Sequence, residues 1–379
     1  MKKFIPYSHQ WINEEDIKEV VGVLRSDWIT QGSKVEEFEK LLAKYCKAKY
    51  ALAVSSGTAA LHLAYLAAGI KPGDEVVTTP LTFAATSNCL VHCGGKPVFS
   101  DVEEDTLNIN PELVEGLISH KTRAISVVDF AGHPCNLDEI KKTARKHSLL
   151  VIEDASHALG AEYKRRRVGA LADLTVFSFH PVKLITSGEG GAVLTDRKDF
   201  YEKMKTLRNH GIVKRPEKGG WYYEIESPGF NYRITDIQSA LAVSQMKNLE
   251  KFLRRRREIA NFYNKAFGSV KELTLPVQKS YAKSAWHIYP VRLNLEKLRA
   301  GRRKIFEAFQ KEGLGVQVHY MPLHLHPYYK KRFGYKLGDF PVAEKYYQRA
   351  ITLPLFPRMT REEAQQVVKT VKKAIIFYK

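Results

Sequence analysis

Two patterns of apolar residues alternate along the chain. Short, nearly continuous apolar runs are followed by longer segments in which apolar residues recur at helical spacing. The short runs indicate buried strands, and the longer segments indicate amphipathic helices. Expected strands in the first half are residues 50–55, 75–79, 96–101, 123–129 and 149–154, and expected helices include 35–46 and 137–147. This alternation predicts βα units and a mainly parallel sheet that is covered on both faces.

The same patterns suggest how the chain divides into domains. Residues 13–25 have helical spacing with Asn13 as a cap, and one long helix, or two, should run from 235 to 267. We expect a large domain over residues 1–245, with an N-terminal arm over 1–12, and a linker helix and smaller C-terminal α/β domain over 246–379. The elements expected in that smaller part are strands at 287–293 and 315–319 and helices at 296–312, 341–350 and 360–376.

Composition narrows the class of protein. Hydrophobic residues make up 44% of the 379 residues, which is typical of a globular protein. No apolar run reaches the roughly 18 residues that a membrane-spanning helix needs. The N-terminal sequence MKKFIPYSHQW has no apolar stretch after its lysines, so we expect no secretory signal. We therefore expect a cytoplasmic protein with no membrane partner.

The formal net charge of +19 raises nucleic acid as a partner. The densest basic runs are residues 164–167, which fall in a turn, and 254–257, which fall in a helical pattern. Both are expected to be solvated faces, and no nucleic-acid-binding motif accompanies them. We expect no nucleic-acid partner, and an anionic small substrate such as a nucleotide diphosphate would also suit a basic protein. Salt-dependent DNA binding is the alternative, and the purpose of the charge stays open.

The cysteines and histidines allow metal hypotheses that their context does not favour. The cysteines are too few and too irregularly spaced for a disulfide framework. Cys89, His92 and Cys93 have no second pair at zinc-site spacing. The histidines within HYMPLHLHPYY (His319, His324 and His326) lie among proline and aromatic residues, which favours a substrate-facing loop. We expect no metal.

The segment FSFHPVKLITSGEGGAVLT, residues 177–195, carries the clearest chemical signal. It reads as a strand, a polar turn with Lys183, a glycine-rich bend around Glu189 and a second strand. Phe177, Phe179 and Leu184 would shield Lys183, so its amine should lose a proton more easily than a solvated lysine, whose pKa is about 10.4. A neutral amine can attack an aldehyde and hold it as a Schiff base. An isolated lysine is usually surface, but here the polar groups of Ser178 and His180 stand beside it.

Three other segments could belong to the same site. Ser56-Gly57-Thr58 joins a strand to a helix, where unpaired N–H groups can bind an anion, although simple N-capping is the more ordinary explanation. Phe83 could pack in the core or lie flat on a bound aromatic ring. Asp154 ends a strand at the edge where ligands of such sheets collect, and a cationic heterocyclic nitrogen would balance its charge. His157 would lie on the same side, and capping and packing are the alternatives for this pair. No GxGxxG motif follows any expected strand, so a dinucleotide fold is set aside.

Five segments together resemble the DegT/DnrJ/EryC1/StrS family of sugar aminotransferases. They are SSGTAAL, TTPLTFAAT, VIEDASHALG, FSFHPVKLITSGEGG and GFNYRITDIQSA, and the likeness covers nearly the whole chain. The resemblance implies an α/β fold of the aspartate aminotransferase type (type I), with a large, mainly parallel sheet domain and a smaller C-terminal α/β domain. It also implies pyridoxal 5′-phosphate (PLP) as cofactor and a homodimer with shared active sites.

The resemblance assigns a role to each residue of these segments. Lys183 would be the Schiff-base lysine and proton carrier, Asp154 would pair with the pyridinium nitrogen, and Phe83 would stack on the ring. His157 would contact the ring hydroxyl, although many relatives have glutamine there. The remaining implied cofactor contacts are Ser56, Gly57, Thr58 and Ser178, with Asn231 reaching the cofactor of the neighbouring subunit. Relatives with histidine in place of the lysine dehydrate their substrate, so the lysine here favours transfer of an amino group.

Within that family, SVVDFAGHP, DASHALGAEY, SFHPVK and GVQVHYMPLH resemble the branch that works in pseudaminic acid biosynthesis. This implies L-glutamate as amino donor and a UDP-linked 4-keto-6-deoxy-N-acetylhexosamine as acceptor, giving the 4-amino sugar of L-altro configuration. The implied substrate contacts are Tyr7, Arg25, Ser26, Asp27, Trp28, Ser55, Gln317, Val318, His319 and Tyr320. Another nucleotide keto sugar, such as UDP-4-keto-arabinose or a dTDP-4-keto-6-deoxy sugar, is the alternative.

Overall fold

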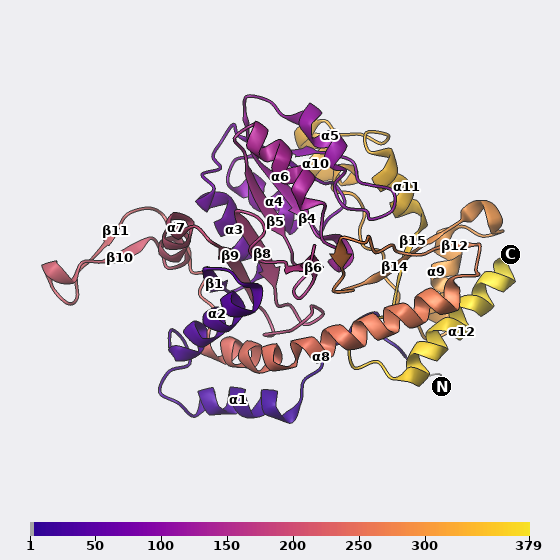
Figure 1. Cartoon of the computed structure of the whole chain (residues 1–379), viewed down its shortest axis with the longest axis horizontal. Coiled ribbons are helices and arrows are strands. Elements are labelled where there is room, and N and C mark those ends of the chain that lie inside the picture. The colour runs from indigo at the N-terminus through magenta and orange to yellow at the C-terminus, as the bar shows by residue number, and fades with distance from the viewer. Residues whose placement is uncertain (1–3) are drawn as a thin grey trace.

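The structure, a computed structural model, describes residues 4–379 as two α/β units that share one long helix (Figure 1). The first three residues of the predicted N-terminal arm lie outside the described residues. The rest of the arm runs beside the smaller unit, where Ile5 pairs with Leu314. Among residues 4–379, no helix combines the length and the apolar character that crossing a membrane requires.

The larger unit is built on a seven-stranded sheet in the order β1-β9-β8-β5-β4-β2-β3. Strand β9 is antiparallel to both of its neighbours, and the other neighbouring pairs are parallel. The predicted, mainly parallel sheet is therefore confirmed. Its strands are β1 (Tyr50–Val54), β2 (Glu75–Thr78), β3 (Lys96–Phe99), β4 (Thr122–Val128), β5 (Leu150–Asp154), β8 (Leu174–Ser178) and β9 (Gly191–Thr195).

Helices cover both faces of this sheet because successive strand residues point to opposite sides. Phe177 packs in a core with α2 and α6, whereas Val176 packs with α3, α4 and α7. The helices of this unit are α1 (Glu14–Leu24), α2 (Ser33–Cys46), α3 (Gly57–Ala67), α4 (Ala85–His92), α5 (Pro111–Val114), η1 (Glu115–Leu117), η2 (Phe130–Gly132), α6 (Leu137–Lys146) and α7 (Lys198–Arg208). The predicted Asn13 cap of α1 forms, since its side chain accepts from Asp16 N.

Helix α8 (Asp236–Phe267) resolves the choice between one helix and two in favour of one. Its start is fixed by a capping box in which the side chains of Thr235 and Gln238 bond each other's backbone N–H. Leu249 and Leu253 pack into the core of the larger unit, and Tyr263 and Phe267 pack into that of the smaller unit. The helix therefore belongs to both cores, and the domain limit at residue 245 stays a prediction.

The smaller unit has a three-stranded antiparallel sheet with helices α9 and α12 beside it. Its elements are β12 (Leu273–Thr274), β14 (Tyr289–Leu293), η4 (Leu295–Lys297), α9 (Arg302–Lys311), η5 (Leu323–Leu325), α10 (Pro327–Phe333), α11 (Pro341–Arg349), β15 (Ala350–Leu353) and α12 (Arg361–Tyr378). The predicted strand 315–319 is wrong, because only Gln317 bridges to Thr352 before the chain leaves the sheet. The predicted helix 296–312 begins only at Arg302, after Gly301.

Two hairpins lie outside these layers. Strands β6 (Glu162–Tyr163) and β7 (Arg166–Arg167), together with β13 (Ala282–Lys283), form a small sheet. The predicted basic turn lies at its tip, where Lys164 and Arg165 adopt positive φ. The second hairpin, β10 (Ile212–Lys214) and β11 (Tyr223–Ile225), with η3 (Pro216–Lys218) between its strands, projects well away from the rest of the chain (Figure 1).

Candidate active site

A cavity of about 410 Å³ lies at the carboxyl ends of the sheet strands, where both units meet. The larger unit contributes Asp154 from the end of β5 and Ser178 from the end of β8. The smaller unit contributes residues that follow α8 and precede η5. These residues are His287, His319 and Tyr320, and the N-terminal segment adds Tyr7. The position agrees with the expectation that ligands of open α/β sheets collect at this edge.

Lys183 lies in the turn after β8, where its backbone N–H donates to His180 O at 2.9 Å. Phe177, Phe179 and Leu184 around it are buried. The side chain reaches the cavity, but its amine is desolvated, and this burial lowers the lysine pKa to about 8. The charge of Asp154 acts in the opposite direction and raises it. The shielding inferred from the sequence is therefore present, and about a tenth of the amine is neutral at pH 7, far more than for a solvated lysine.

Asp154 is a buried carboxylate that bonds only neutral groups. Its Oδ2 accepts from Thr86 Oγ1 at 2.6 Å, and its Oδ1 accepts from Ser156 N at 3.2 Å. Thr82 Oγ1 lies 2.8 Å from Thr86 Oγ1 and completes a short chain of hydroxyl groups on that side. No lysine or arginine among residues 4–379 forms an ion pair with this carboxylate. A cationic ligand group in the cavity would balance its charge.

Thr86 was not predicted as part of the site. Its position four residues after Thr82, in a segment expected to be helical, is the signal that could have placed the two hydroxyl groups together, although α4 itself begins only at Ala85. Its Oγ1 orients the carboxylate of Asp154 toward the cavity, as a hydrogen bond to a charged group does.

The start of α3 supports both interpretations of Ser56-Gly57-Thr58. Ser56 caps the helix, since its Oγ accepts from Ala59 N at 3.0 Å, and the first-turn N–H groups still have no intrahelical partner. A Cβ on Gly57 would lie 2.8 Å from Ser178 Cβ, and one on Gly191 would lie 2.4 Å from Ser56 O. These two glycines therefore let the helix start approach β8 and β9 closely, at a site suited to an anion.

Aromatic groups form the remaining wall of the cavity. Phe83 lines the cavity with 59% of its surface exposed, so the alternative of core packing is wrong. Its ring centroid lies 6.0 Å from that of Tyr320. Tyr320 Oη is 3.2 Å from Nε2 of His157, which is buried. Burial, together with Lys183 and His319, lowers the pKa of His157 well below its usual value, so this imidazole is neutral.

His287 lines the cavity and was also missed by sequence reasoning. It is buried against His157, with ring centroids 4.3 Å apart. No motif marks this position, because His287 reaches the cavity only through the packing of the smaller unit on the larger one. His319 is held differently, with its Nδ1 2.9 Å from Thr352 Oγ1, and burial lowers its pKa to about 4.

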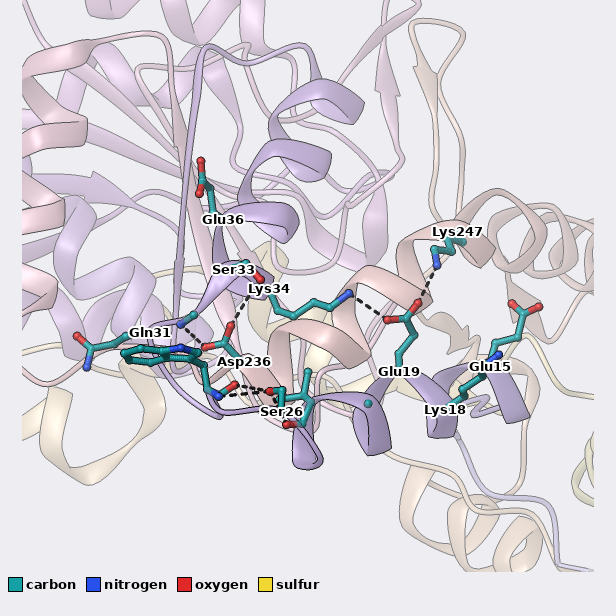
Figure 2. A pocket seen from close by; sticks show the side chains of 14 residues that line it. Glu15, Lys18, Glu19, Ser26, Gln31, Ser33, Lys34, Glu36, Asp236 and Lys247 are labelled. Carbon is teal, nitrogen blue, oxygen red and sulfur yellow. Dashed lines mark hydrogen bonds and ion pairs between the residues drawn. The ribbon is translucent and has the colours of Figure 1, made fainter.

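Several predicted contacts do not lie in this cavity of the single chain. Ser26 and Trp28 line a separate, larger groove of about 1170 Å³ between α1 and the start of α8, and Arg25 and Asp27 flank them (Figure 2). Asn231 is exposed at the base of the projecting hairpin, where it bridges to Asn209. Ser55, Gln317 and Val318 lie next to lining residues without lining the cavity themselves. Their substrate or cofactor roles stay predictions.

Two of the histidines considered as metal ligands, His319 and His324, have other hydrogen-bond partners. His324 Nε2 bonds Glu344 Oε1 at 2.8 Å, and His319 faces the active-site cavity. In the described part of the chain, no group of three or more histidine, cysteine, aspartate or glutamate side chains is placed to hold a metal ion.

Comparisons with known proteins place these features in a family. The model of the DegT/DnrJ/EryC1/StrS aminotransferase family matches residues 10–372. An uncharacterized protein of Methanocaldococcus jannaschii is 48% identical, over 99% of this chain and 98% of its own length. The spore coat polysaccharide biosynthesis protein SpsC of Bacillus subtilis is 42% identical, over 98% and 97%. The UDP-4-amino-4,6-dideoxy-N-acetyl-beta-L-altrosamine transaminase of Campylobacter jejuni is also 42% identical, over 97% and 96%.

Solved structures agree with these sequence relatives. PseC of Helicobacter pylori, an aminotransferase involved in the biosynthesis of pseudoaminic acid, superposes with a TM-score of 0.94 at 35% identity, covering 99% of this chain and all of PseC. The PLP form of the putative sugar aminotransferase Spr1654 of Streptococcus pneumoniae has a TM-score of 0.93 at 31% identity and covers 99% of both chains. The expected PLP-dependent aminotransferase fold is thereby confirmed.

Proposed function

Because the chain belongs to the DegT/DnrJ/EryC1/StrS aminotransferase family, we propose that it transfers an amino group from L-glutamate to C4 of a UDP-linked 4-keto-6-deoxy-N-acetylhexosamine. The family establishes a PLP-dependent sugar aminotransferase. The finer proposal is that the product is UDP-4-amino-4,6-dideoxy-N-acetyl-β-L-altrosamine, as in pseudaminic acid biosynthesis. It is supported by the names of the Campylobacter relative and the Helicobacter structure. The cytoplasmic location stays a prediction.

The observation that carries the proposal is the fit of the cavity to PLP. A buried carboxylate without a cationic partner, Asp154, suits a protonated ring nitrogen, and the helix start at Gly57 suits a phosphate. Phe83 offers a free aromatic face, and Lys183 offers a desolvated amine. Bound PLP would supply an aldehyde that carries the amino group and a ring that accepts electrons from the reacting carbon.

The chain's own residues would handle the protons of the reaction. The Nζ atom of Lys183 would take a proton from the amino donor and later return one at the sugar carbon, and a pKa near 8 lets this amine act in both directions. Asp154, oriented by Thr86, would keep the ring nitrogen protonated. The neutral His157 would hold the ring hydroxyl, and its Nε2 already contacts Tyr320. Glutamate and the sugar would use the same cavity in turn, which predicts ping-pong kinetics.

We propose a homodimer with shared active sites as the working state. Trp221, Tyr223 and Ile225 on the projecting hairpin are 83%, 55% and 65% exposed, and so much apolar surface on one segment is typical of an interface. Asn231 follows that hairpin and is exposed, as a residue that reaches a neighbouring subunit must be. Sedimentation analysis should give a dimer, and a fully active monomer would contradict the proposal.

A different nucleotide keto sugar is the second candidate. SpsC is as similar to this chain as the Campylobacter transaminase, so the identities do not separate the pathways. The deciding experiment is to incubate the enzyme with glutamate and a panel of UDP- and dTDP-linked 4-keto sugars and to determine the product configuration by NMR. Turnover confined to UDP-4-keto-arabinose or a dTDP-linked sugar would move the assignment to that pathway.

A further inference from the structure

Arg256, in the middle of α8, is a fully buried arginine behind the active-site cavity. None of its surface is exposed, and its Nη1 donates to three backbone carbonyl groups. The acceptors are Trp286 O at 3.4 Å, His287 O at 3.0 Å and Leu355 O at 3.1 Å. Its Nε and Nη2 are buried and have no hydrogen-bond partner.

The charge of this guanidinium is not balanced by an acid. Within residues 4–379 no carboxylate lies at ion-pair distance from Arg256, and only burial changes its pKa, which falls to about 9. The group is therefore still a cation at neutral pH. Carbonyl dipoles alone offset only part of the desolvation free energy of a buried charge. We therefore expect the charge to have a role beyond folding.

One residue links this charge to the predicted cofactor contacts. The backbone carbonyl group of His287 accepts from Arg256. The buried imidazole ring of His287 packs against that of His157, with ring centroids 4.3 Å apart. The Nδ1 atoms of both histidines are buried without a partner. The charged or titratable groups that face these rings are Lys183, His319 and Tyr320, with Asp154 across the cavity.

We propose that Arg256 is an electrostatic positioning residue, which acts through His287 and His157 to favour the deprotonated, anionic form of bound PLP. The inference rests on the PLP-dependent function. The imidazoles of His287 and His157 are neutral, so neither supplies a negative charge that would offset the guanidinium. The charge of Arg256 acts on His287, which lines the cavity, and the same positive potential would attract the ring oxygen and the phosphate of the cofactor.

The neighbouring arginine provides a matched control. Arg257 also donates to backbone carbonyl groups only, to Ser284 O and Gly160 O at 3.1 Å each. It is half-buried on another side of α8, and its charge is not among the causes that shift the pKa values of His157, Lys183 and His287. Arg257→Met therefore removes the same kind of bond without the proposed electrostatic effect.

The experiment compares Arg256→Met, Arg256→Lys and Arg257→Met as PLP-loaded proteins. The first measurement is the pH titration of the visible absorbance of the bound cofactor, and the second is the dissociation constant of PLP. We expect Arg256→Met to raise the pKa of that titration by about one unit and to weaken PLP binding by about tenfold. Arg256→Lys should keep most of the wild-type pKa because it keeps the charge, and Arg257→Met should not change it.

The outcomes separate this inference from the proposed function. If Arg256→Met binds PLP and the pKa of the absorbance titration is unchanged, the arginine has only a structural role as donor to three carbonyl groups, and the inference is overturned. The inference is also overturned if Arg257→Met raises the pKa of the titration as much as Arg256→Met does. If Arg256→Met does not fold, Arg256→Lys decides: a rise of the full expected unit in a variant that keeps the charge would overturn the inference. If the shift occurs while no nucleotide sugar is aminated, the inference stands and the substrate assignment fails.

Discussion

Two of the depressions in the described part of the chain differ in how their charges are arranged. The groove of about 1170 Å³ beside α1 has charges of both signs, and they neutralise each other. Lys34 and Lys247 both reach Glu19 at 3.1 Å, and Asp236 accepts from two backbone N–H groups (Figure 2). The cavity of about 410 Å³ is smaller, and Lys183 and Asp154, together with the neighbouring Arg256, are buried there without matched partners.

This difference shows that size is a poor guide to chemistry. The ion pairs of the larger groove are partly solvated, and such pairs contribute little to stability. In the smaller cavity, burial lowers the pKa values of Lys183, His157 and His319, and such shifts are typical of a reactive site. The predictions below test that contrast, starting with the largest expected effect.

Replacing the cavity lysine should have a far larger effect than replacing a lysine of the groove. We expect Lys183→Ala to lower turnover by at least about 10,000-fold, because both the covalent attachment and the proton transfer are lost. Lys34→Ala should leave turnover within about twofold while removing an exposed pair of the groove. Initial rates with glutamate, and borohydride trapping with peptide mapping, measure both effects. Full activity of Lys183→Ala, or an adduct on another lysine, would refute the assignment.

Removing the charge of Asp154 should have the next largest effect. Asp154→Asn should lower turnover by about 100- to 1000-fold, because one preorganised electrostatic contact is lost at the reacting ring. Thr86→Val, which removes the 2.6 Å bond to that carboxylate and the contact with Thr82 but keeps the charge, should cost about tenfold. Both variants should keep the wild-type thermal unfolding profile to within a few degrees. Equal losses in the two variants would show that the hydroxyl group, and not the charge, is what matters.

The pH dependence of cofactor capture should separate the cavity lysine from ordinary lysines. The pKa of Lys183 is lowered to about 8, so its reactive neutral fraction grows as pH rises and is nearly complete above that value. The rate at which the cofactor-free protein captures PLP should rise by about tenfold per pH unit below pH 8 and level off above it. Stopped-flow absorbance follows this rate. A rate that keeps rising to pH 10 would mean that the amine is solvated.

A buried acid pair on the opposite face of the sheet should affect stability and not turnover. Burial raises the pKa of Asp129 well above its usual value and that of Glu153 to about 7. The folded protein therefore binds protons that the unfolded chain has released, so stability falls as pH rises from about 4 through 7. Asp129→Asn should reduce this loss and raise the free energy of unfolding at pH 8 by about 1 kcal/mol. Urea titrations at pH 5 and pH 8 measure the difference, and an unchanged slope would contradict it.

The smallest effect should come from the groove itself. Glu19→Gln breaks two ion pairs, yet both are partly exposed, so the free energy of unfolding should change by less than about 1 kcal/mol. Even that change should shrink in high salt. If Glu19→Gln instead weakened binding of the nucleotide sugar, the predicted contacts at Ser26 and Trp28 would gain support and the groove would have a role in the site.

The central sheet could be predicted from the sequence because its strands are buried on both faces. Runs such as the one that ends at Asp154 are apolar without interruption, and strand ends in a parallel sheet gather at one edge. The positions of Lys183 and Asp154 followed from that rule. Family resemblance then supplied their roles, together with those of Phe83 and His157, which local patterns had left open.

What the sequence did not reveal depends on contacts between distant segments. His287 reaches the site only when the smaller unit packs on the larger one, and nothing in its local sequence marks it. The prediction that the basic run 254–257 is a solvated face is wrong for Arg256, which is buried where α8 meets carbonyl groups of the smaller unit. The strand expected at 315–319 satisfied the apolar pattern, but its backbone pairs only at Gln317. The hairpin around Trp221 has strands of only three residues each, and neither strand has a buried residue, so periodicity could not identify it.

Helix α8 has a mechanical consequence. Its 32 residues contain neither glycine nor proline, and a helix of that length spans about 48 Å with no point at which it bends easily. Since the cores of both units pack on this one continuous helix, we expect no hinge motion that opens and closes the two units. Access for a bulky sugar nucleotide must then come from local loop movements or from the arrangement of subunits.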